Sequence, residues 1–117
     1  MAAHAPNISG FNGSYEELVA AVCQAPGLVV VDLFAQWCPP CKRLSEYLPT
    51  LAQEYQKVTF LKVDIDQSRE LATHYQVNSI PHLRFLKAGP GSQIQELATV
   101  TGADIQQIKA KIGQFGQ

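Results

Sequence analysis

The stretch from Leu28 to Lys42 restricts what this chain can fold into more than any other part of it. Its first seven residues, Leu28–Phe34, are apolar except for Asp32, which is typical of a strand buried on both faces of a sheet. A short turn follows and carries two cysteines, Cys38 and Cys41, in a Cys-x-x-Cys pattern. A helical pattern begins directly after the first cysteine. The sequence therefore predicts a buried strand, a turn with two thiols and a helix at the centre of the fold.

The spacing of the two cysteines allows them to close a small disulfide ring with little movement of the backbone. Because Cys38 stands at the predicted start of the helix, free backbone N–H groups and the positive end of the helix dipole face its sulfur. This field favours the thiolate, so we expect Cys38 to have a lowered pKa and to act as the nucleophile. Cys41 should be less exposed, which suits a resolving thiol. Pro39 and Pro40 fit the first turn of a helix, where their missing N–H groups are not needed.

Composition excludes several classes of protein. The 117 residues suit one domain, and 46% hydrophobic with 16% charged residues is ordinary for a globular chain. A net charge of -1 gives no basic patch for nucleic acid or a membrane surface, and no apolar run approaches the ~20 residues of a spanning helix. No signal peptide is expected, because the first residues lack a Lys or Arg followed by an apolar stretch. Three cysteines are too few for a disulfide scaffold, which indicates a reducing compartment and a cytoplasmic protein.

The remaining chain alternates between strand and helix patterns. Residues 1–13 form a weakly structured lead in which Ile8 can start a short edge strand. Ser14 and Glu17 form a capping box at the first helix, and Asp104 caps the last one. The fold class is therefore α/β, with a mixed central β-sheet flanked by helices on both faces, in a single domain over residues 1–117. The expected helices cover residues 15–24, 38–55, 66–75 and 105–112, and the expected strands cover residues 28–34, 58–65, 82–87 and 94–100.

Two charged residues do not match the apolar strands that contain them. Asp32 interrupts the central strand, and Lys62 interrupts the strand expected over residues 58–65. A buried charge is unfavourable unless it is paired, and a buried carboxyl group tends to keep its proton. We therefore expect a raised pKa for Asp32, with Lys62 near it beneath the cysteine turn. One interpretation is a structural pair that fixes strand register, and the other is that Asp32, through water, takes the proton of Cys41 when that thiol attacks a mixed disulfide.

The segment Val31–Lys42 resembles the active site of the thioredoxin family, and the resemblance extends from about Ser14 to about Phe115. It implies a thioredoxin fold and a thiol–disulfide oxidoreductase that reduces protein disulfides. The redox-active group is then a Cys38–Cys41 disulfide, with no bound cofactor and no metal. Electrons come from a thioredoxin reductase that uses NADPH, and the substrates include the disulfides of peroxiredoxins and of ribonucleotide reductase. The chain is expected to act as a monomer.

The same resemblance implies roles for residues away from the cysteines. In the family, an acidic residue and a lysine occupy the positions of Asp32 and Lys62. The proline that matches Pro81 follows a cis peptide bond and packs against the cysteines, while the backbone of Ile80 pairs with an extended substrate segment. Gly102 matches a glycine that lets the substrate backbone approach closely. The implied docking surface is shallow and apolar, and comprises Trp37, Pro39, Pro40, Ile80, Pro81 and Gly102.

Plainer interpretations of these residues remain open. The Ile80-Pro81 pair fits an ordinary turn before a strand, Gly102 fits a loop that leads into the last helix, and Trp37 fits the core.

Several residues depart from the common family pattern. Pro39 stands where glycine is usual, which leaves the redox potential open. His82 stands where threonine is frequent, and it either titrates near neutral pH and tunes the thiols or faces solvent. Arg84 stands where an apolar residue is usual. Cys23, in the first helix, is expected to be a buried and inert thiol.

Two other functions fit the same motif. An oxidant or isomerase of protein disulfides, of the kind used in secretion, is disfavoured by the lack of a signal peptide. A binding module that uses the same surface without redox chemistry is disfavoured by the presence of both cysteines. A zinc site has weak support, because one Cys-x-x-Cys pair is accompanied only by His4, His74 and His82.

Overall fold

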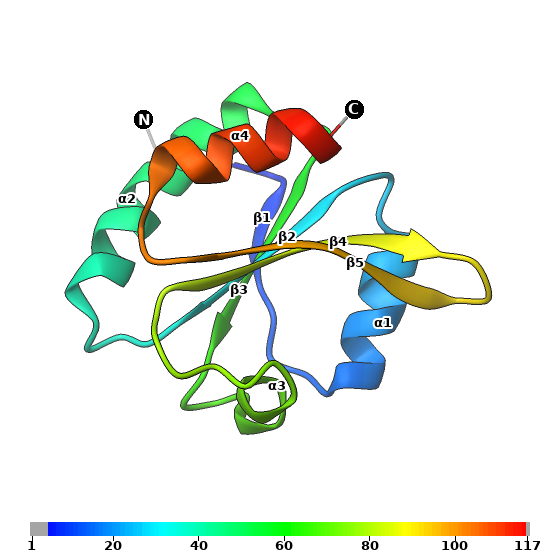
Figure 1. The fold of residues 1–117 in the computed structure, drawn as a ribbon, viewed down its shortest axis with the longest axis horizontal. Helices are drawn as coiled ribbons and strands as arrows, with labels where there is room; N and C mark the ends of the chain where they lie inside the picture. Colours follow the sequence, from blue (N-terminus) through cyan, green and yellow to red (C-terminus); the bar gives the residue numbers. More distant parts are fainter. Residues whose placement is uncertain (1–4, 117) are drawn as a thin grey trace.

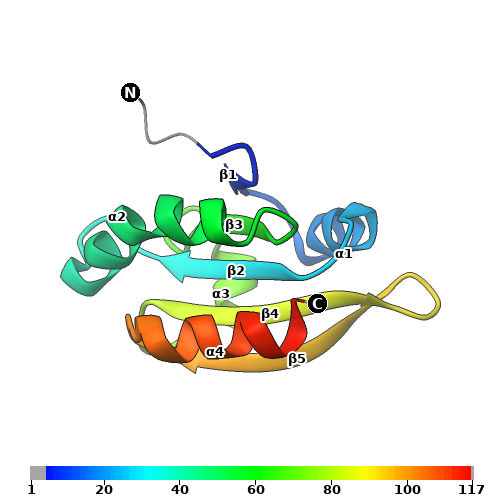
Figure 2. The ribbon, with the colours of Figure 1, turned by 90° about the horizontal axis from the view of Figure 1, so that it is seen from above.

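The computed structural model describes residues 5–116, whose strands form one mixed sheet (Figure 1). The elements along the chain are β1 (Ile8–Gly10), α1 (Tyr15–Gln24), β2 (Val29–Phe34), α2 (Pro39–Glu54), β3 (Thr59–Asp64), α3 (Arg69–His74), β4 (His82–Gly89), β5 (Gln93–Thr101) and α4 (Ile105–Phe115). The strand order is β1-β3-β2-β4-β5, so β2 is the central strand and β1 and β5 are the edges (Figure 2). β1, β3 and β2 run parallel, whereas β4 is antiparallel to β2 and β5 is antiparallel to β4.

Helices cover both faces of this sheet, as the sequence predicts. α2 and α4 lie on one face, where Leu48 and Ile108 belong to the same core (Figure 1). α1 and α3 lie on the other face, where Leu18 and Leu71 belong to a second core. Alternate residues of β2 enter opposite cores. This explains why the strand is apolar throughout rather than alternating, since both of its faces are covered.

Side chains at the helix starts set two of the boundaries. Ser14 Oγ accepts a hydrogen bond from the backbone N–H of Glu17 at 3.1 Å, and Glu17 Oε1 accepts one from the N–H of Ser14 at 2.8 Å. Asp104 Oδ1 accepts from the N–H of Gln107 at 3.1 Å. Both caps were predicted from the sequence, and each satisfies N–H groups that the first helical turn leaves without partners.

The third helix begins later than expected, at Arg69 instead of residue 66. The chain first makes a turn, in which Asp64 Oδ1 accepts from the N–H of Asp66 at 2.9 Å and the Asp64 carbonyl accepts from the N–H of Ser68 at 2.8 Å. Such local bonds of an aspartate compete with the helix. The hairpin strands are longer than expected, β4 reaching Gly89 and β5 running over Gln93–Thr101, because a tight turn joins them.

The N-terminal segment, residues 1–13, was expected to be weakly structured. From Ala5 onward it is ordered, and residues 1–4 lie outside the described part of the chain. Ala5 is buried, and β1 pairs with β3, which confirms the edge strand at Ile8. The side-chain amide of Asn7 donates to three carbonyl groups at 3.1, 3.2 and 2.8 Å, and these groups belong to Ala52, Tyr55 and Val58. Carbonyl groups at a helix end lack partners within the helix, so Asn7 ties the end of α2 to the start of β3.

Replacing Asn7 with alanine should lower the free energy of unfolding by about 2 kcal/mol, because three carbonyl groups lose their common donor. Urea unfolding followed by tryptophan fluorescence measures this quantity. The matched control is Asn78→Ala, at an exposed position, for which we expect a change within about 0.5 kcal/mol. An Asn7→Ala protein as stable as this control would contradict the assignment.

Candidate active site

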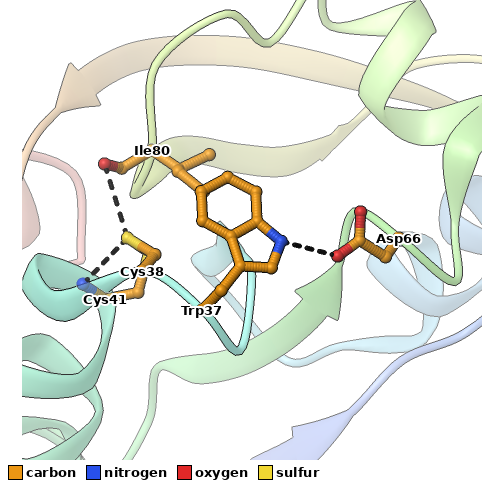
Figure 3. The surroundings of a disulfide bond; sticks show 5 residues. All are labelled: Trp37, Cys38, Cys41, Asp66 and Ile80. Atoms are coloured by element: carbon orange, nitrogen blue, oxygen red, sulfur yellow. Dashed lines mark hydrogen bonds between the residues drawn. A yellow bond between two sulfur atoms is a disulfide. The ribbon is translucent and has the colours of Figure 1, made fainter.

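The two cysteines lie where β2 ends and α2 begins (Figure 3). The chain turns through a bond from the backbone N–H of Cys38 to the carbonyl of Ala35, at 3.3 Å. Cys38 is the N-cap of α2, with Pro39 and Pro40 in the first helical turn. Cys38 and Cys41 form a disulfide with their Cα atoms 5.2 Å apart. The backbone N–H of Cys41 donates to Cys38 Sγ at 3.2 Å, so one of the free donors of the helix start faces this sulfur.

The protein covers both sulfurs in this disulfide form. Cys38 is 3% exposed and Cys41 is 2% exposed, so the clear difference in exposure that we expected is absent. Ala35 belongs to the same buried cluster, and the partly buried side chains that pack against it are those of Phe34, Ile65 and Ile80. The disulfide therefore lies in an apolar shell built from three segments of the chain.

The segment before β4 lies against this disulfide. Its Ile80-Pro81 peptide bond is cis, in agreement with the resemblance, and the carbonyl oxygen of Ile80 lies 3.8 Å from Cys38 Sγ (Figure 3). The buried Pro81 accepts a hydrogen bond at its carbonyl from the N–H of Gly102, at 2.8 Å. Gly102 has φ +89, a conformation that favours glycine, and a Cβ there would meet nothing within 4 Å. Residues distant in sequence thus meet beside Cys38.

Trp37 lies on the surface at the rim of the turn, so the interpretation as a core residue is wrong. Its side chain is 67% exposed. The indole Nε1 donates to Asp66 Oδ2 at 3.0 Å, and Figure 3 shows the ring between the cysteine turn and Asp66. Sequence reasoning missed Asp66, which follows β3. The only local signal for it is the turn formed with Asp64, and that turn does not point to Trp37.

Asp32 lies inside the sheet on the strand that leads to the cysteines. It is 2% exposed, and neither carboxylate oxygen has a hydrogen-bond partner among the described residues. Burial raises the pKa of Asp32 to about 7, and the positive charge of Lys62 opposes part of this rise. Lys62 is the register partner of Asp32 on β3. The raised pKa and the neighbouring lysine were both predicted from the sequence.

An open cavity of about 360 Å³ adjoins Cys41. Its lining combines apolar and polar side chains, namely Phe34, Ala35, Gln36, Cys41, Lys42, Ser45 and Lys62. Lys62 reaches across it, because its Nζ donates to Ser45 Oγ at 2.6 Å and lies 5.0 Å from the centroid of the Phe34 ring. The cavity thus reaches from the surface to the side of the disulfide that carries Cys41, which it leaves 2% exposed. No pattern in the sequence points to Ser45.

His82 is buried, at 6% exposure, so the prediction of a solvent-facing histidine is wrong. Its Nε2 accepts a hydrogen bond from Arg84 Nε at 3.0 Å. Burial, and then the charge of Arg84, lower the pKa of His82, which keeps the imidazole neutral. Arg84 also donates to the carbonyl of Tyr75 at 3.2 Å and pairs with Glu96 at 3.7 Å. The two residues that depart from the family pattern, both in β4, are therefore hydrogen-bonded to each other.

Cys23 is half-buried, so the prediction of a buried thiol is also wrong. The neighbouring Val22 faces the core instead. Cys23 Sγ lies 4.0 Å from the carbonyl oxygen of Gln93, at the start of β5. In Figure 1, this end of α1 is remote from the start of α2, so Cys23 takes no part in the site.

Residues 5–116 contain no group of three or more His, Cys, Asp or Glu side chains that could hold a metal ion. His74 stacks on Tyr15 with ring centroids 3.9 Å apart, and His4 lies outside the described residues. The same part of the chain contains no helix that is long and apolar enough to cross a membrane.

Known proteins share this arrangement. A family model described as Thioredoxin matches residues 11–114. The chain belongs to the thioredoxin family. The thioredoxin of Chlamydia trachomatis is 54% identical over 65 residues, which cover 56% of this chain and 64% of the relative's length. The solved structure of Trichomonas vaginalis thioredoxin superposes with a TM-score of 0.87 at 45% identity, covering 94% of this chain and 98% of that one.

One further solved structure comes from a yeast mitochondrial system. It concerns the thiol-resolving mechanism of a 1-Cys peroxiredoxin via glutathione and thioredoxin systems, and it matches with a TM-score of 0.81 at 27% identity over 92% of this chain and 95% of that one.

Membership in the thioredoxin family confirms the expected fold and activity. The five-stranded mixed sheet with helices on both faces is a thioredoxin fold. The chain is a thiol–disulfide oxidoreductase that reduces protein disulfides, and its redox-active group is the Cys38–Cys41 disulfide.

The raised pKa of Asp32 makes the stability of this thioredoxin-family protein depend on pH. The folded protein holds the Asp32 proton up to about pH 7, whereas the unfolded chain releases it near pH 3.8. The contribution of this group to the free energy of unfolding is therefore fully present below pH 3.8 and is lost as the pH rises through 7. Asp32→Asn, which mimics the protonated side chain, should therefore gain stability relative to the natural protein as the pH rises. The gain between pH 4 and pH 7.5 should reach no more than about 4 kcal/mol.

Urea unfolding of the disulfide form at several pH values measures this difference. Glu46→Gln removes an exposed carboxylate and serves as the control, for which we expect no comparable trend. Parallel pH curves for Asp32→Asn and the natural protein would rule out a buried, proton-holding Asp32.

Proposed function

We propose that Cys38 attacks the substrate disulfide and that Cys41 resolves the mixed disulfide, in a general reductant of protein disulfides. The supporting observation is the environment of Cys38 Sγ, which accepts the N–H of Cys41 at 3.2 Å and lies 3.8 Å from the carbonyl oxygen of Ile80. In the reduced protein the same N–H faces a thiolate, and a hydrogen bond to the charged form lowers the pKa of a thiol.

The exchange proceeds in two steps. The Cys38 thiolate forms a bond to one substrate sulfur, the substrate disulfide breaks, and the other substrate sulfur leaves as a thiolate. Cys41 then loses its proton and attacks Cys38 Sγ, the mixed disulfide breaks, and the second substrate sulfur leaves as a thiolate. The substrate has then gained two electrons, and the pair has become the Cys38–Cys41 disulfide.

Asp32 is the proposed acceptor of the Cys41 proton, through water. The positive charge of Lys62 adjusts the pKa of the Asp32 carboxyl group. A carboxyl group whose pKa is about 7 can take a proton and release it again near neutral pH. The open cavity beside Cys41 supports the Cys41 end of a path through water, because it has room for several water molecules, and Lys62, the register partner of Asp32, lines it. The alternative is that Asp32 and Lys62 form a purely structural pair. The geometry gives this alternative little support, because the carboxylate and the ammonium group are not hydrogen-bonded to each other.

The proposed docking surface surrounds Cys38. An extended substrate segment would pair with the backbone of Ile80 and cross the open space above Gly102. Trp37 adds an exposed aromatic side chain, which suits contact with a partner that is itself a protein. The full set is Trp37, Pro39, Pro40, Ile80, Pro81 and Gly102.

The proposed partners are protein disulfides of peroxiredoxin type and of ribonucleotide reductase, with electrons supplied by an NADPH-dependent thioredoxin reductase. The peroxiredoxin context of one structural relative supports the first of these. We propose that residues 1–117 act as a single domain and a monomer in the cytoplasm, and that the Cys-Pro-Pro-Cys turn, with Pro39 in place of glycine, defines the subgroup to which this chain belongs.

Cys38→Ser should reduce insulin disulfides no faster than dithiothreitol alone, because the attacking sulfur is gone. Cys41→Ser should perform the first step only and accumulate a mixed disulfide in a one-to-one ratio, visible by mass spectrometry. Cys23→Ser is the matched control and should retain the natural rate. A mixed disulfide trapped on Cys41 in the Cys38→Ser protein, with none formed on Cys38 in the Cys41→Ser protein, would reverse the assigned order.

Asp32→Asn should slow the resolving step about 100-fold at pH 7, because the proton acceptor of Cys41 is lost. In the natural protein the rate should rise through pH 7, as the Asp32 carboxyl group ionises. The difference between the two proteins should shrink above about pH 9, where the thiol ionises without a base. Stopped-flow tryptophan fluorescence of a preformed mixed disulfide gives the rate, and identical pH profiles would remove Asp32 from the mechanism.

A further inference from the structure

Ser45 brings a hydroxyl group to the cavity beside the disulfide. It lies in α2 four residues after Cys41, so both side chains lie on the same side of the helix. Both line the cavity, and Ser45 is half-buried. Its hydroxyl group therefore shares a partly enclosed space with one of the two reacting sulfurs.

The Ser45 hydroxyl bonds to another element instead of its own helix. A serine inside a helix commonly bonds to the carbonyl four residues earlier or to solvent. Here Ser45 Oγ accepts from Lys62 Nζ at 2.6 Å, which links α2 to β3. The ring of Phe34 lies 5.0 Å from the same ammonium group, so an apolar surface and a hydroxyl together define its position.

Lys62 is the charge that acts on Asp32. The two residues are register partners on β3 and β2, and Lys62 lowers the pKa of the carboxyl group that burial raises. The strand on the other side of β2 contributes Leu83 opposite Asp32, which carries no charge. From α2, Lys42 lines the cavity, and the cysteine pair supplies its titratable thiols when it is reduced. The position of the Lys62 ammonium group is thus the feature of the site that can change the pKa of Asp32.

We propose that Ser45 is a positioning residue that keeps the Lys62 ammonium group in the cavity and so adjusts the proton affinity of Asp32 during the resolving step. The proposal rests on the role proposed above for Asp32. An ammonium group is strongly hydrated and its stem is flexible, so without the hydroxyl acceptor it moves out to solvent. Asp32 then loses part of the nearby positive charge and holds its proton to a higher pH.

The test compares Ser45→Ala with Ser45→Thr, which keeps the hydroxyl group. Carbon-13 NMR of the Asp32 carboxyl carbon in the disulfide form gives its titration midpoint. Ser45→Ala should raise this midpoint by roughly half to one pH unit, while Ser45→Thr should stay close to the natural protein. A link that only stabilises the packing of α2 on the sheet would leave the midpoint unchanged. An unchanged or lowered midpoint in folded Ser45→Ala therefore overturns the proposal.

A double-mutant cycle with Lys62→Met checks that Ser45 acts through the lysine. Lys62→Met should itself raise the Asp32 midpoint, and adding Ser45→Ala should then change nothing further. An equal rise on addition of Ser45→Ala to Lys62→Met would mean that the hydroxyl acts on Asp32 directly, against the proposal.

The NMR midpoint also separates this proposal from the function of Asp32. If Ser45→Ala shifts the midpoint but the resolving rate of Asp32→Asn keeps the natural pH profile, the Ser45–Lys62–Asp32 link holds and the role of Asp32 as proton acceptor fails. If both the midpoint and the pH profile of the resolving rate move upward in Ser45→Ala, both proposals are supported.

Discussion

The burial of β2 on both faces is the constraint from which the active site follows. Because β2 is central, β3 and β4 must lie on either side of it, and each supplies one part of the site. Parallel pairing places Lys62 opposite Asp32, whereas antiparallel pairing places His82 opposite Leu33. The residues just before His82 therefore lie beyond the end of β2, where the cysteine turn begins. The contact between Ile80 and Cys38 is a consequence of strand register.

Much of this arrangement could be predicted from the sequence. The apolar run around Asp32, the periodicity of the helices and the cap at Ser14 are local signals, and elements predicted from them were found close to their expected positions. The raised pKa of Asp32 could also be predicted, because a carboxyl group inside a strand that is covered on both faces loses its water. The family resemblance added the cis peptide bond before Pro81, which local patterns do not specify.

The features that were missed are polar contacts between distant segments. Asn7 bonds to carbonyl groups 45 or more residues away, and Trp37 bonds to Asp66 across 29 residues. No periodicity signals such pairs, because the partners are far apart in the sequence and several of them contribute only a backbone carbonyl group. His82 was misjudged for a related reason: its imidazole is buried with a hydrogen bond from Arg84, whose side chain also reaches the carbonyl of Tyr75 at the end of α3. An arginine in a strand position that is usually apolar was a visible departure, but its partners were not.

The cavity on the Cys41 side of the disulfide lies apart from the side on which the proposed protein substrate would bind. Its walls come from β2, β3 and α2, whereas Ile80 approaches the disulfide at Cys38 from the segment before β4. A protein partner bound over Ile80 and Trp37, as proposed above, would cover the Cys38 side of the disulfide and leave the mouth of this cavity open. Water in the cavity would then give protons a route to and from the Cys41 side of the disulfide while the partner stays bound, so the proposed resolving step would not require the partner to leave first.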